Sequence, residues 1–201
     1  MGLELPEFLK SLFTQPSDTP GVPAVEVSKT IPITATGYSR AQEIAAAVAK
    51  LTSLQQEAIT IYPPKGTTTF CNIGLQHVAN GMGCHAFDNM MATQIVQQAM
   101  NLCMSLPNEW REDSWERAVA HANKGGFAFF GMKAPPGEVH GHVASVAAKP
   151  MEFSGTWGCN VPVLANVGNA KTQGFNKLSK CFLLSERPLL KCILWKWDDT
   201  L

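Results

Sequence analysis

The sequence predicts an α+β fold in which helices come first and an antiparallel sheet follows. Apolar residues at helical spacing dominate the chain from Ser39 to about His121, whereas short runs rich in β-branched and aromatic residues dominate after Gly125. The connections between these later runs are too short for the helical crossovers of parallel strands, so we expect antiparallel pairing. With 201 residues and 45 % hydrophobic content, the chain is long enough for one well-buried core, which we place in residues 37–201.

Residues 1–36 are expected to be a separate N-terminal segment. Leucines and phenylalanines between positions 3 and 13 recur at near-helical spacing, which predicts a short amphipathic helix. Four prolines between positions 14 and 36 predict an extended, Pro-rich connector. The segment lacks the basic start and long apolar core of a standard secretion signal, and the sequence has no 18-residue apolar run. We expect synthesis in the cytoplasm without a standard signal peptide, and no integral membrane segment.

Two capping signatures and their apolar periodicity define the predicted helices. Ser39 to Gln42 has the form of a capping box, and Asp113 to Glu116 repeats it before a helix that Gly125-Gly126 would stop. The predicted helices cover residues 39–61, 71–79, 90–103 and 113–121. The predicted strands are Phe127–Met132, His142–Ala148, Val161–Val167, Lys180–Leu184 and Lys191–Trp197.

The stretch from Thr67 to Ala79 predicts a reactive cysteine at a helix N-terminus. Three threonines and Phe70 lead to Cys71, and the apolar residues that follow fall at helical spacing. Unpaired N–H groups and the positive end of the helix dipole favour thiolate over thiol, and thiolate is the form that attacks a carbonyl carbon. Cys71 is therefore the candidate nucleophile.

A base and a third polar group follow further along the chain. His142 opens a predicted strand after a Pro-Pro-Gly turn, and Asn166 ends the next one. Cysteine, histidine and asparagine in this order can act as nucleophile, base and orienting group, and they need neither metal nor cofactor. In a strand, His140 would point to the same face as His142, so it is expected to compete for the role of base or to line the substrate groove.

These motifs resemble the papain-like NlpC and CHAP (cysteine, histidine-dependent amidohydrolase/peptidase) families of peptidoglycan hydrolases. The residues that carry the resemblance are Phe70-Cys71-Asn72, Gly141-His142-Val143-Ala144 and the Val-Pro-Val-Leu-Ala-Asn run that ends at Asn166. The match covers roughly residues 67–182. It implies a papain-like fold with N-terminal helices packed on a C-terminal antiparallel sheet. It also implies a thiolate at Cys71, a general base at His142 and an orienting role for Asn166.

The resemblance implies cleavage of an amide bond in the cell-wall peptide through a thioester intermediate, by an endopeptidase or an N-acetylmuramoyl-L-alanine amidase. The sequence departs from the family pattern in the position of the third catalytic residue. In these families, that residue usually follows closely after the strand that carries the histidine. Asn166 comes 24 positions after His142, which leaves Asn160 and Glu152 as alternatives. Asn72, His140 and Trp157 are the candidate substrate-binding residues. Such an enzyme would reach the wall through a phage lysis pore or a dedicated secretion machine.

Two other classes of function remain open on the sequence alone. One is a cysteine amidase or acyltransferase with a cytoplasmic substrate, and the other is a wall-binding module without catalysis. Nucleic-acid binding is disfavoured because Lys+Arg and Asp+Glu both number 16, so no broad basic face is expected. His77, Cys84 and His85 lack the paired spacing of a zinc site.

Six cysteines occur in the sequence, and none forms a Cys-x-x-Cys pair. We expect most of them to be free buried thiols, since a chain of this length does not need disulfides to be stable. Cys181 and Cys192 flank a predicted hairpin and are the pair most suited to a bridge. The oligomeric state is not predicted.

Overall fold

The computed structural model describes residues 39–66, 68–135 and 141–197, which include every predicted element except the N-terminal segment. The helices are α2 (Arg40–Ile61), α3 (Cys71–Gly81), α4 (Ala92–Ser105), α5 (Trp115–Ala122), the short α6 (Leu178–Cys181) and a 3-10 helix (Leu184–Leu189). The strands are β1 (Trp110–Glu112), β2 (Phe127–Met132), β3 (His142–Val146), β4 (Glu152–Ser154), β5 (Cys159–Val161), β6 (Val163–Asn166), β7 (Gly174–Lys177) and β8 (Lys191–Trp195). The predicted helix and connector of residues 1–36 lie outside the described residues, as does His140.

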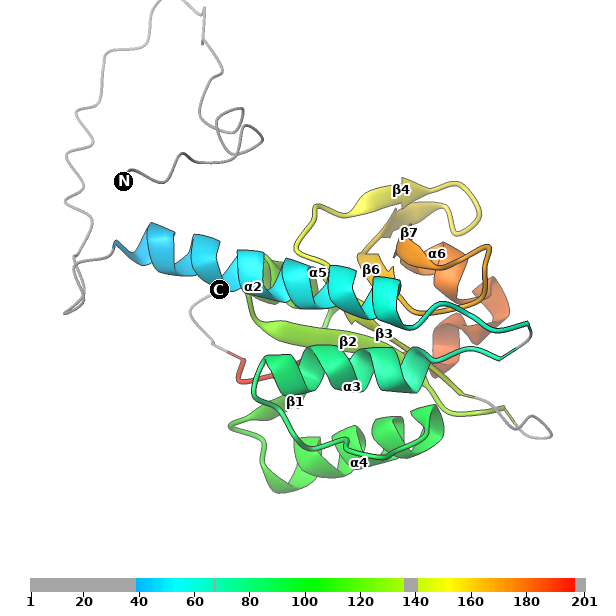
Figure 1. The fold of residues 1–201 in the computed structure, drawn as a ribbon, viewed down its shortest axis with the longest axis horizontal. Helices are drawn as coiled ribbons and strands as arrows, with labels where there is room; N and C mark the ends of the chain where they lie inside the picture. Colours follow the sequence, from blue (N-terminus) through cyan, green and yellow to red (C-terminus); the bar gives the residue numbers. More distant parts are fainter. Residues whose placement is uncertain (1–38, 67, 136–140, 198–201) are drawn as a thin grey trace, which may run out of the picture. The chain divides into compact units, whose positions relative to one another are not determined.

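The strands form a six-stranded antiparallel sheet in the order β1-β8-β2-β3-β6-β7, and β4 and β5 form a separate hairpin. Helices come before most of the strands along the chain and pack against the sheet (Figure 1), which confirms the predicted α+β class. Among the described helices, none is long and apolar enough to cross a membrane.

The two faces of β2 show how both sides of the sheet are covered. Phe129 contacts Phe87, which follows α3, at a ring-centroid distance of 5.6 Å, and Phe130 contacts Trp115 of α5 at 6.0 Å. Consecutive strand residues point to opposite faces, so α5 covers the face opposite to Phe87. All six residues of β2 are buried, which is expected for a central strand covered on both faces.

Two local predictions differ from the structure: the position of the N-cap of α5 and the strand predicted at residues 180–184. The N-cap of α5 is Ser114, one residue later than predicted, because its side chain accepts from the Arg117 amide while Asp113 pairs with Arg111 at 2.9 Å. Residues 180–184 are not a strand. Residues 174–177 take the edge position of the sheet instead, and Leu178, buried and bonded to the Pro162 carbonyl, starts the turn into α6.

All six cysteines are free. The hairpin that would have brought Cys181 and Cys192 together is replaced by α6 and the 3-10 helix, so the structure has no bridge between them. Cys181 follows β7 at one edge of the sheet, whereas Cys192 lies in β8, next to the opposite edge strand β1.

Candidate active site

Cys71 is the first residue of α3, and the start of this helix has no side-chain cap. Its N-cap, Phe70, makes no capping hydrogen bond, so the first backbone N–H groups of the helix stay available to the site. Cys71 itself is 6 % exposed. Gly74 allows α3 to approach the segment after β6 closely, because a Cβ at this position would lie 2.4 Å from Val167 Cγ2.

His142 and Asn166 are joined by a hydrogen bond of 2.8 Å between His142 Nε2 and Asn166 Oδ1. The sheet register explains the contact. Ser145 pairs with Ala165, so Asn166 lies opposite Ala144. His142 is two residues before Ala144 in β3, so its side chain points to the same face of the sheet as those of Ala144 and Asn166. Diagonal neighbours in an antiparallel pair are within reach of long or aromatic side chains.

The separation of 24 residues between the histidine and the asparagine is filled by the β4-β5 hairpin. The two alternatives for the third group lie on this hairpin: Glu152, in β4, is exposed and lies 3.6 Å from Lys177, and Asn160, in β5, is exposed as well. Neither makes a hydrogen bond to His142 within the described chain, whereas Asn166 does.

The orientation of the Asn166 amide is fixed by a second hydrogen bond. Asn166 is 0 % exposed, and its Nδ2 donates to the Thr172 carbonyl at 2.7 Å. Its Oδ1 therefore faces His142, and because an amide oxygen only accepts, His142 Nε2 carries the proton of this bond. The other ring nitrogen, Nδ1, keeps its lone pair and is free to accept a proton.

The His142 ring is also held by packing. Its centroid lies 5.0 Å from that of Phe182, a buried residue at the end of α6. Gly141 precedes His142, and a Cβ at this position would lie 2.5 Å from the Met132 carbonyl oxygen. The backbone before β3 can therefore approach the end of β2 this closely only with glycine at position 141. The imidazole is thus fixed on one side by Asn166 and on another by Phe182.

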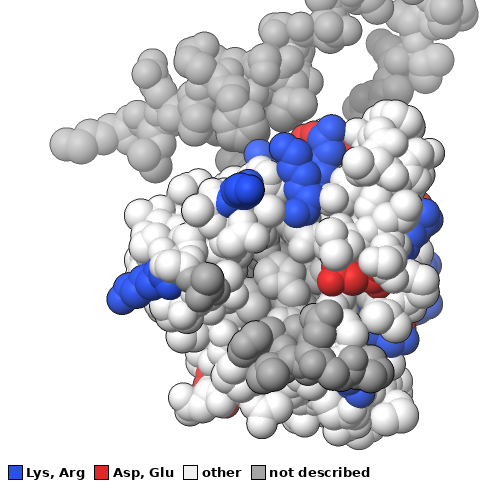
Figure 2. Space-filling view, turned by 90° about the vertical axis from the view of Figure 1, so that its right-hand side faces the viewer, with Lys and Arg blue, Asp and Glu red and all other residues white. Residues whose placement is uncertain are grey.

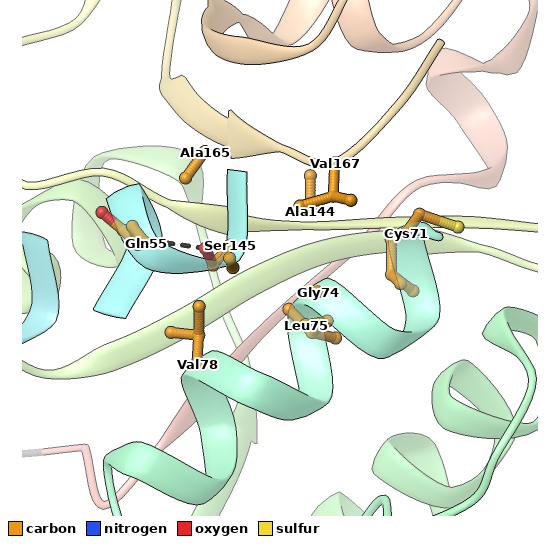
Figure 3. A pocket seen from close by; sticks show the side chains of 11 residues that line it. Gln55, Cys71, Gly74, Leu75, Val78, Ala144, Ser145, Ala165 and Val167 are labelled. Atoms are coloured by element: carbon orange, nitrogen blue, oxygen red, sulfur yellow. Dashed lines mark hydrogen bonds between the residues drawn. The ribbon is translucent and has the colours of Figure 1, made fainter. Parts of the chain in front are cut away.

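The helix that begins at Cys71, α3, packs against β3, the strand that begins at His142. The backbone N–H of Val143, the residue after His142, acts as a hydrogen-bond donor to the Cys71 sulfur. Figure 3 shows the contact region behind the cysteine: Gly74, Leu75 and Val78 of α3 face Ala144 and Ser145 of β3, with the Cys71 sulfur at one end of this row and Gln55 at the other.

Gln55 links α2 to the strand that carries His142. It is 0 % exposed, and its Nε2 donates to the Val146 carbonyl at 2.8 Å. The same Nε2 donates to Ser145 Oγ at 3.2 Å (Figure 3). A second amide, Gln173, joins the Asn166 loop to the same helix through the Ile59 carbonyl at 2.7 Å. The base strand and the asparagine loop are therefore both attached to α2.

Burial disfavours the charged form of both Cys71 and His142. Burial raises the pKa of the Cys71 thiol above its ordinary value, although the amides of Val143, Asn72 and Cys71 and the side chain of Thr69 act to lower it. Burial also lowers the pKa of the His142 imidazole, against the hydrogen bond to Asn166, which acts to raise it. Burial therefore acts against the thiolate that the sequence predicts at Cys71, whereas the amides at the helix start act in its favour, and the thiolate stays a prediction.

The remaining predicted site residues have different positions. Asn72 lines the hollow beside Cys71, but its Nδ2 donates to the Met90 carbonyl at 3.0 Å. Trp157 is 7 % exposed and packs against Trp115 at 5.9 Å, outside the hollows that contain Cys71 or His142. His77 faces away and contacts Glu57 at 3.4 Å. In the described part of the chain, no group of three or more acidic, histidine or cysteine side chains is arranged to hold a metal ion.

Sequence reasoning missed Thr69, Thr172 and Phe182, all of which line the hollow at His142. The run of threonines before Cys71 drew attention to the segment but did not distinguish Thr69 from its neighbours. Thr172 and Phe182 carry no motif of their own.

The sequence matches no model of a known protein family, and no curated protein matches it. The resemblance to the NlpC and CHAP families therefore stays a prediction that rests on the motifs.

Proposed function

We propose that the protein is a papain-like cysteine hydrolase that cleaves an amide bond of the peptidoglycan peptide. The observation that carries the proposal is the hydrogen bond between His142 and Asn166, at a strand end that packs beside a cysteine at a helix start. This is the arrangement that nucleophilic catalysis requires: a thiol, a base and a group that fixes the base. The peptidoglycan substrate comes from the motif resemblance alone.

In the proposed reaction, His142 Nδ1 takes the proton of the Cys71 thiol as the sulfur attacks the carbonyl carbon. The carbon–nitrogen bond then breaks, and the imidazolium returns the proton to the leaving amine. Water, deprotonated by His142, hydrolyses the thioester and releases a carboxylic acid and the free thiol. Throughout, Asn166 Oδ1 keeps the Nε2 proton in place and supports the charge on the ring.

The oxyanion of the tetrahedral intermediate needs hydrogen-bond donors close to the Cys71 sulfur. The backbone N–H of Cys71 is one, since the helix start is uncapped. The Asn72 side chain is occupied by the Met90 carbonyl, so it does not serve as the second. The Thr69 hydroxyl is the better candidate, because it is within hydrogen-bond reach of the Cys71 sulfur and Thr69 lines the hollow beside Cys71 as well as the hollow beside His142.

The test is digestion of purified peptidoglycan by the wild-type protein and by Cys71→Ala, with soluble fragments identified by mass spectrometry. We expect fragments from the wild type only. Cys103→Ala is the matched control, because Cys103 is another free helical thiol, located in α4. Fragments released equally by Cys71→Ala would refute the assignment of the nucleophile, and no fragments from any wall type would refute the substrate.

A further inference from the structure

Gln173, the last residue of the loop between β6 and β7, joins this loop to the end of α2. Its side-chain Oε1 accepts a hydrogen bond from the Gly168 N–H at 2.9 Å, and its Nε2 donates to the Ile59 carbonyl at 2.7 Å. The same Nε2 donates to the carbonyl of Tyr62, the C-cap of α2, at 3.4 Å. The amide thus supplies a donor to carbonyls that the end of a helix leaves unpaired. We call these side-chain bonds the Gln173 link.

The backbone of Gln173 holds the acceptor that orients Asn166. The Thr172 carbonyl and the Gln173 N–H belong to one planar peptide group. This N–H donates to the Asn169 carbonyl at 2.8 Å. The carbonyl on the other side of the same group accepts from Asn166 Nδ2 at 2.7 Å. The peptide group that fixes the Asn166 amide is therefore bonded directly to the residue whose side chain is attached to α2.

The loop and the helix that it is attached to are both closely packed. A Cβ at Gly168 would lie 2.5 Å from Asn166 Nδ2 and 2.6 Å from Thr172 Oγ1, so the loop backbone lies directly against the Asn166 amide. On the other side of the link, α2 is anchored in the core by Leu51 and Ala58, which are 0 % and 1 % exposed. A movement of the loop relative to α2 would therefore move the Asn166 amide as well.

The Gln173 link adds no charge beside His142. Its donors and acceptors are amide and carbonyl groups, so it holds Asn166 without adding a further charge that would change the pKa of the imidazole. Figure 2 shows the end of the molecule at which α2 ends and α3 begins, with basic side chains gathered in its upper part and much of the other described surface uncharged. The effect expected of the link is therefore on the orientation and the tautomer of the ring.

We propose that Gln173 is a positioning residue, which holds the Asn166 amide oxygen toward His142 Nε2 by attaching the loop to α2. The proposal rests on the assignment of His142 as the base in the proposed function. With Asn166 Oδ1 in place, the Nε2–H tautomer of the ring is favoured, and Nδ1 is the nitrogen that accepts the thiol proton. Without the link, the loop can move, and the ring should also adopt the Nδ1–H tautomer, in which Nδ1 cannot act as a base.

The direct test reads the tautomer of His142 by long-range ¹H–¹⁵N NMR of histidine-labelled protein at about pH 8, where the ring is neutral. The signals of His142 are identified by their loss in His142→Ala. Gln173→Met keeps the length of the side chain and removes every bond of the link. We expect the ratio of the Nδ1–H to the Nε2–H tautomer to rise about fivefold, the effect of losing one net hydrogen bond. An unchanged ratio would overturn the proposal.

Two charged variants separate the bonds of the link. Gln173→Lys keeps a donor for the carbonyls at the end of α2, where a cation is also favoured by the helix dipole. Gln173→Glu keeps only an acceptor for the Gly168 N–H. We expect Gln173→Lys to retain the tautomer ratio of the wild type and Gln173→Glu to change it as Gln173→Met does. The opposite order would show that the attachment to α2 does not position the ring.

Gln55→Met is the matched control, because Gln55 also attaches α2 to the sheet, but through the Val146 carbonyl of β3. It should lower the thermal stability and leave the tautomer ratio of His142 unchanged. An equal change of the ratio in Gln55→Met would attribute the effect to lost stability and contradict the proposal. In an Asn166→Ala background, Gln173→Met should cause no further change, since Gln173 acts through Asn166. A further change of full size would also contradict it.

The outcomes separate this proposal from the proposed function, because the tautomer is measured without a substrate. If Gln173→Met changes the ratio and also slows peptidoglycan cleavage about tenfold or more, both are supported. If the ratio changes but Cys71→Ala releases the same fragments as the wild type, the positioning role stands and the proposed function is wrong. If cleavage requires Cys71 but the ratio is unchanged, the proposed function stands and the positioning role is overturned.

Discussion

Replacing Asn166 tests the most specific contact of the site. Asn166→Ala removes the hydrogen bonds to His142 Nε2, at 2.8 Å, and to the Thr172 carbonyl, at 2.7 Å. Two such bonds contribute about 2 kcal/mol to the free energy of unfolding, and buried groups left unpaired add to the loss. The Thr172 carbonyl keeps a second donor, Asn176 Nδ2 at 3.0 Å, so we expect a total near 2–3 kcal/mol.

The larger effect of this substitution is expected on the reaction. Without Asn166 Oδ1, the His142 ring can rotate and exchange its tautomer, and a misplaced catalytic group commonly costs about 100-fold in rate. The pH profile gives the signature of a direct contact. The hydrogen bond acts to raise the pKa of His142, so its loss should lower this pKa further and move the acid limb of the profile to lower pH.

Asn166→Asp provides the opposite shift at the same position. A carboxylate beside the imidazole favours the protonated ring, so the pKa of His142 should rise and the acid limb should move to higher pH. The assay is the rate of peptidoglycan cleavage, or of Cys71 alkylation, between pH 4 and 9, with thermal unfolding measured in parallel. A wild-type rate and an unshifted profile in both variants would refute the orienting role of Asn166.

Three further predictions concern Thr69, Gly74 and Cys181. Thr69→Val should slow acylation about 10-fold or more by removing a hydroxyl donor, with Thr69→Ser restoring most of the rate and the neighbouring Thr68→Val unchanged. Gly74→Ala should destabilise the protein by about 1–3 kcal/mol in chemical denaturation, because its Cβ would lie 2.4 Å from Val167, and adding Val167→Ala should recover part of the loss. Burial raises the pKa of Cys181 to about 12 from the unfolded value of 9.0, so its stabilising contribution is complete below pH 9 and is lost as pH rises toward 12. Above pH 9, the free energy of unfolding of Cys181→Ala should fall less steeply with pH than that of the wild type, by the equivalent of about one proton. The same slope in both proteins would contradict the raised pKa of Cys181.

Much of the fold could be predicted because local signals agreed with the tertiary structure. The Ser39 capping box and the apolar spacing after it predict α2, and the six apolar residues from Phe127 predict β2. The short strands β1, β4, β5 and β7 were not predicted, since three or four residues carry no periodicity that stands out from a loop. Their formation depends on strands far away in the sequence, as β1 shows by pairing with β8.

The candidate site was predictable in part: the sequence pointed to His142 and Asn166, which the structure joins, but also to Trp157, which lies outside the hollows, and it missed Thr69, Thr172 and Phe182. A cysteine before helical spacing, a histidine that opens a strand and an asparagine that ends one are visible in the sequence, and the register that brings Asn166 to His142 is not. The balance between burial and the helix start at Cys71 depends on how closely α3 packs against β3 and the Asn166 loop, which only the structure reveals.

The position of β8 has a consequence for how the protein is made. Among the described elements, β8 (residues 191–195) comes last in the sequence, yet it pairs with both β1 and β2 inside the sheet. A ribosome-bound chain that lacks them has a gap between β1 and β2, so the sheet that positions His142 cannot close. Long-range pairing of this kind slows folding, and the nascent chain should therefore be inactive until synthesis has passed β8.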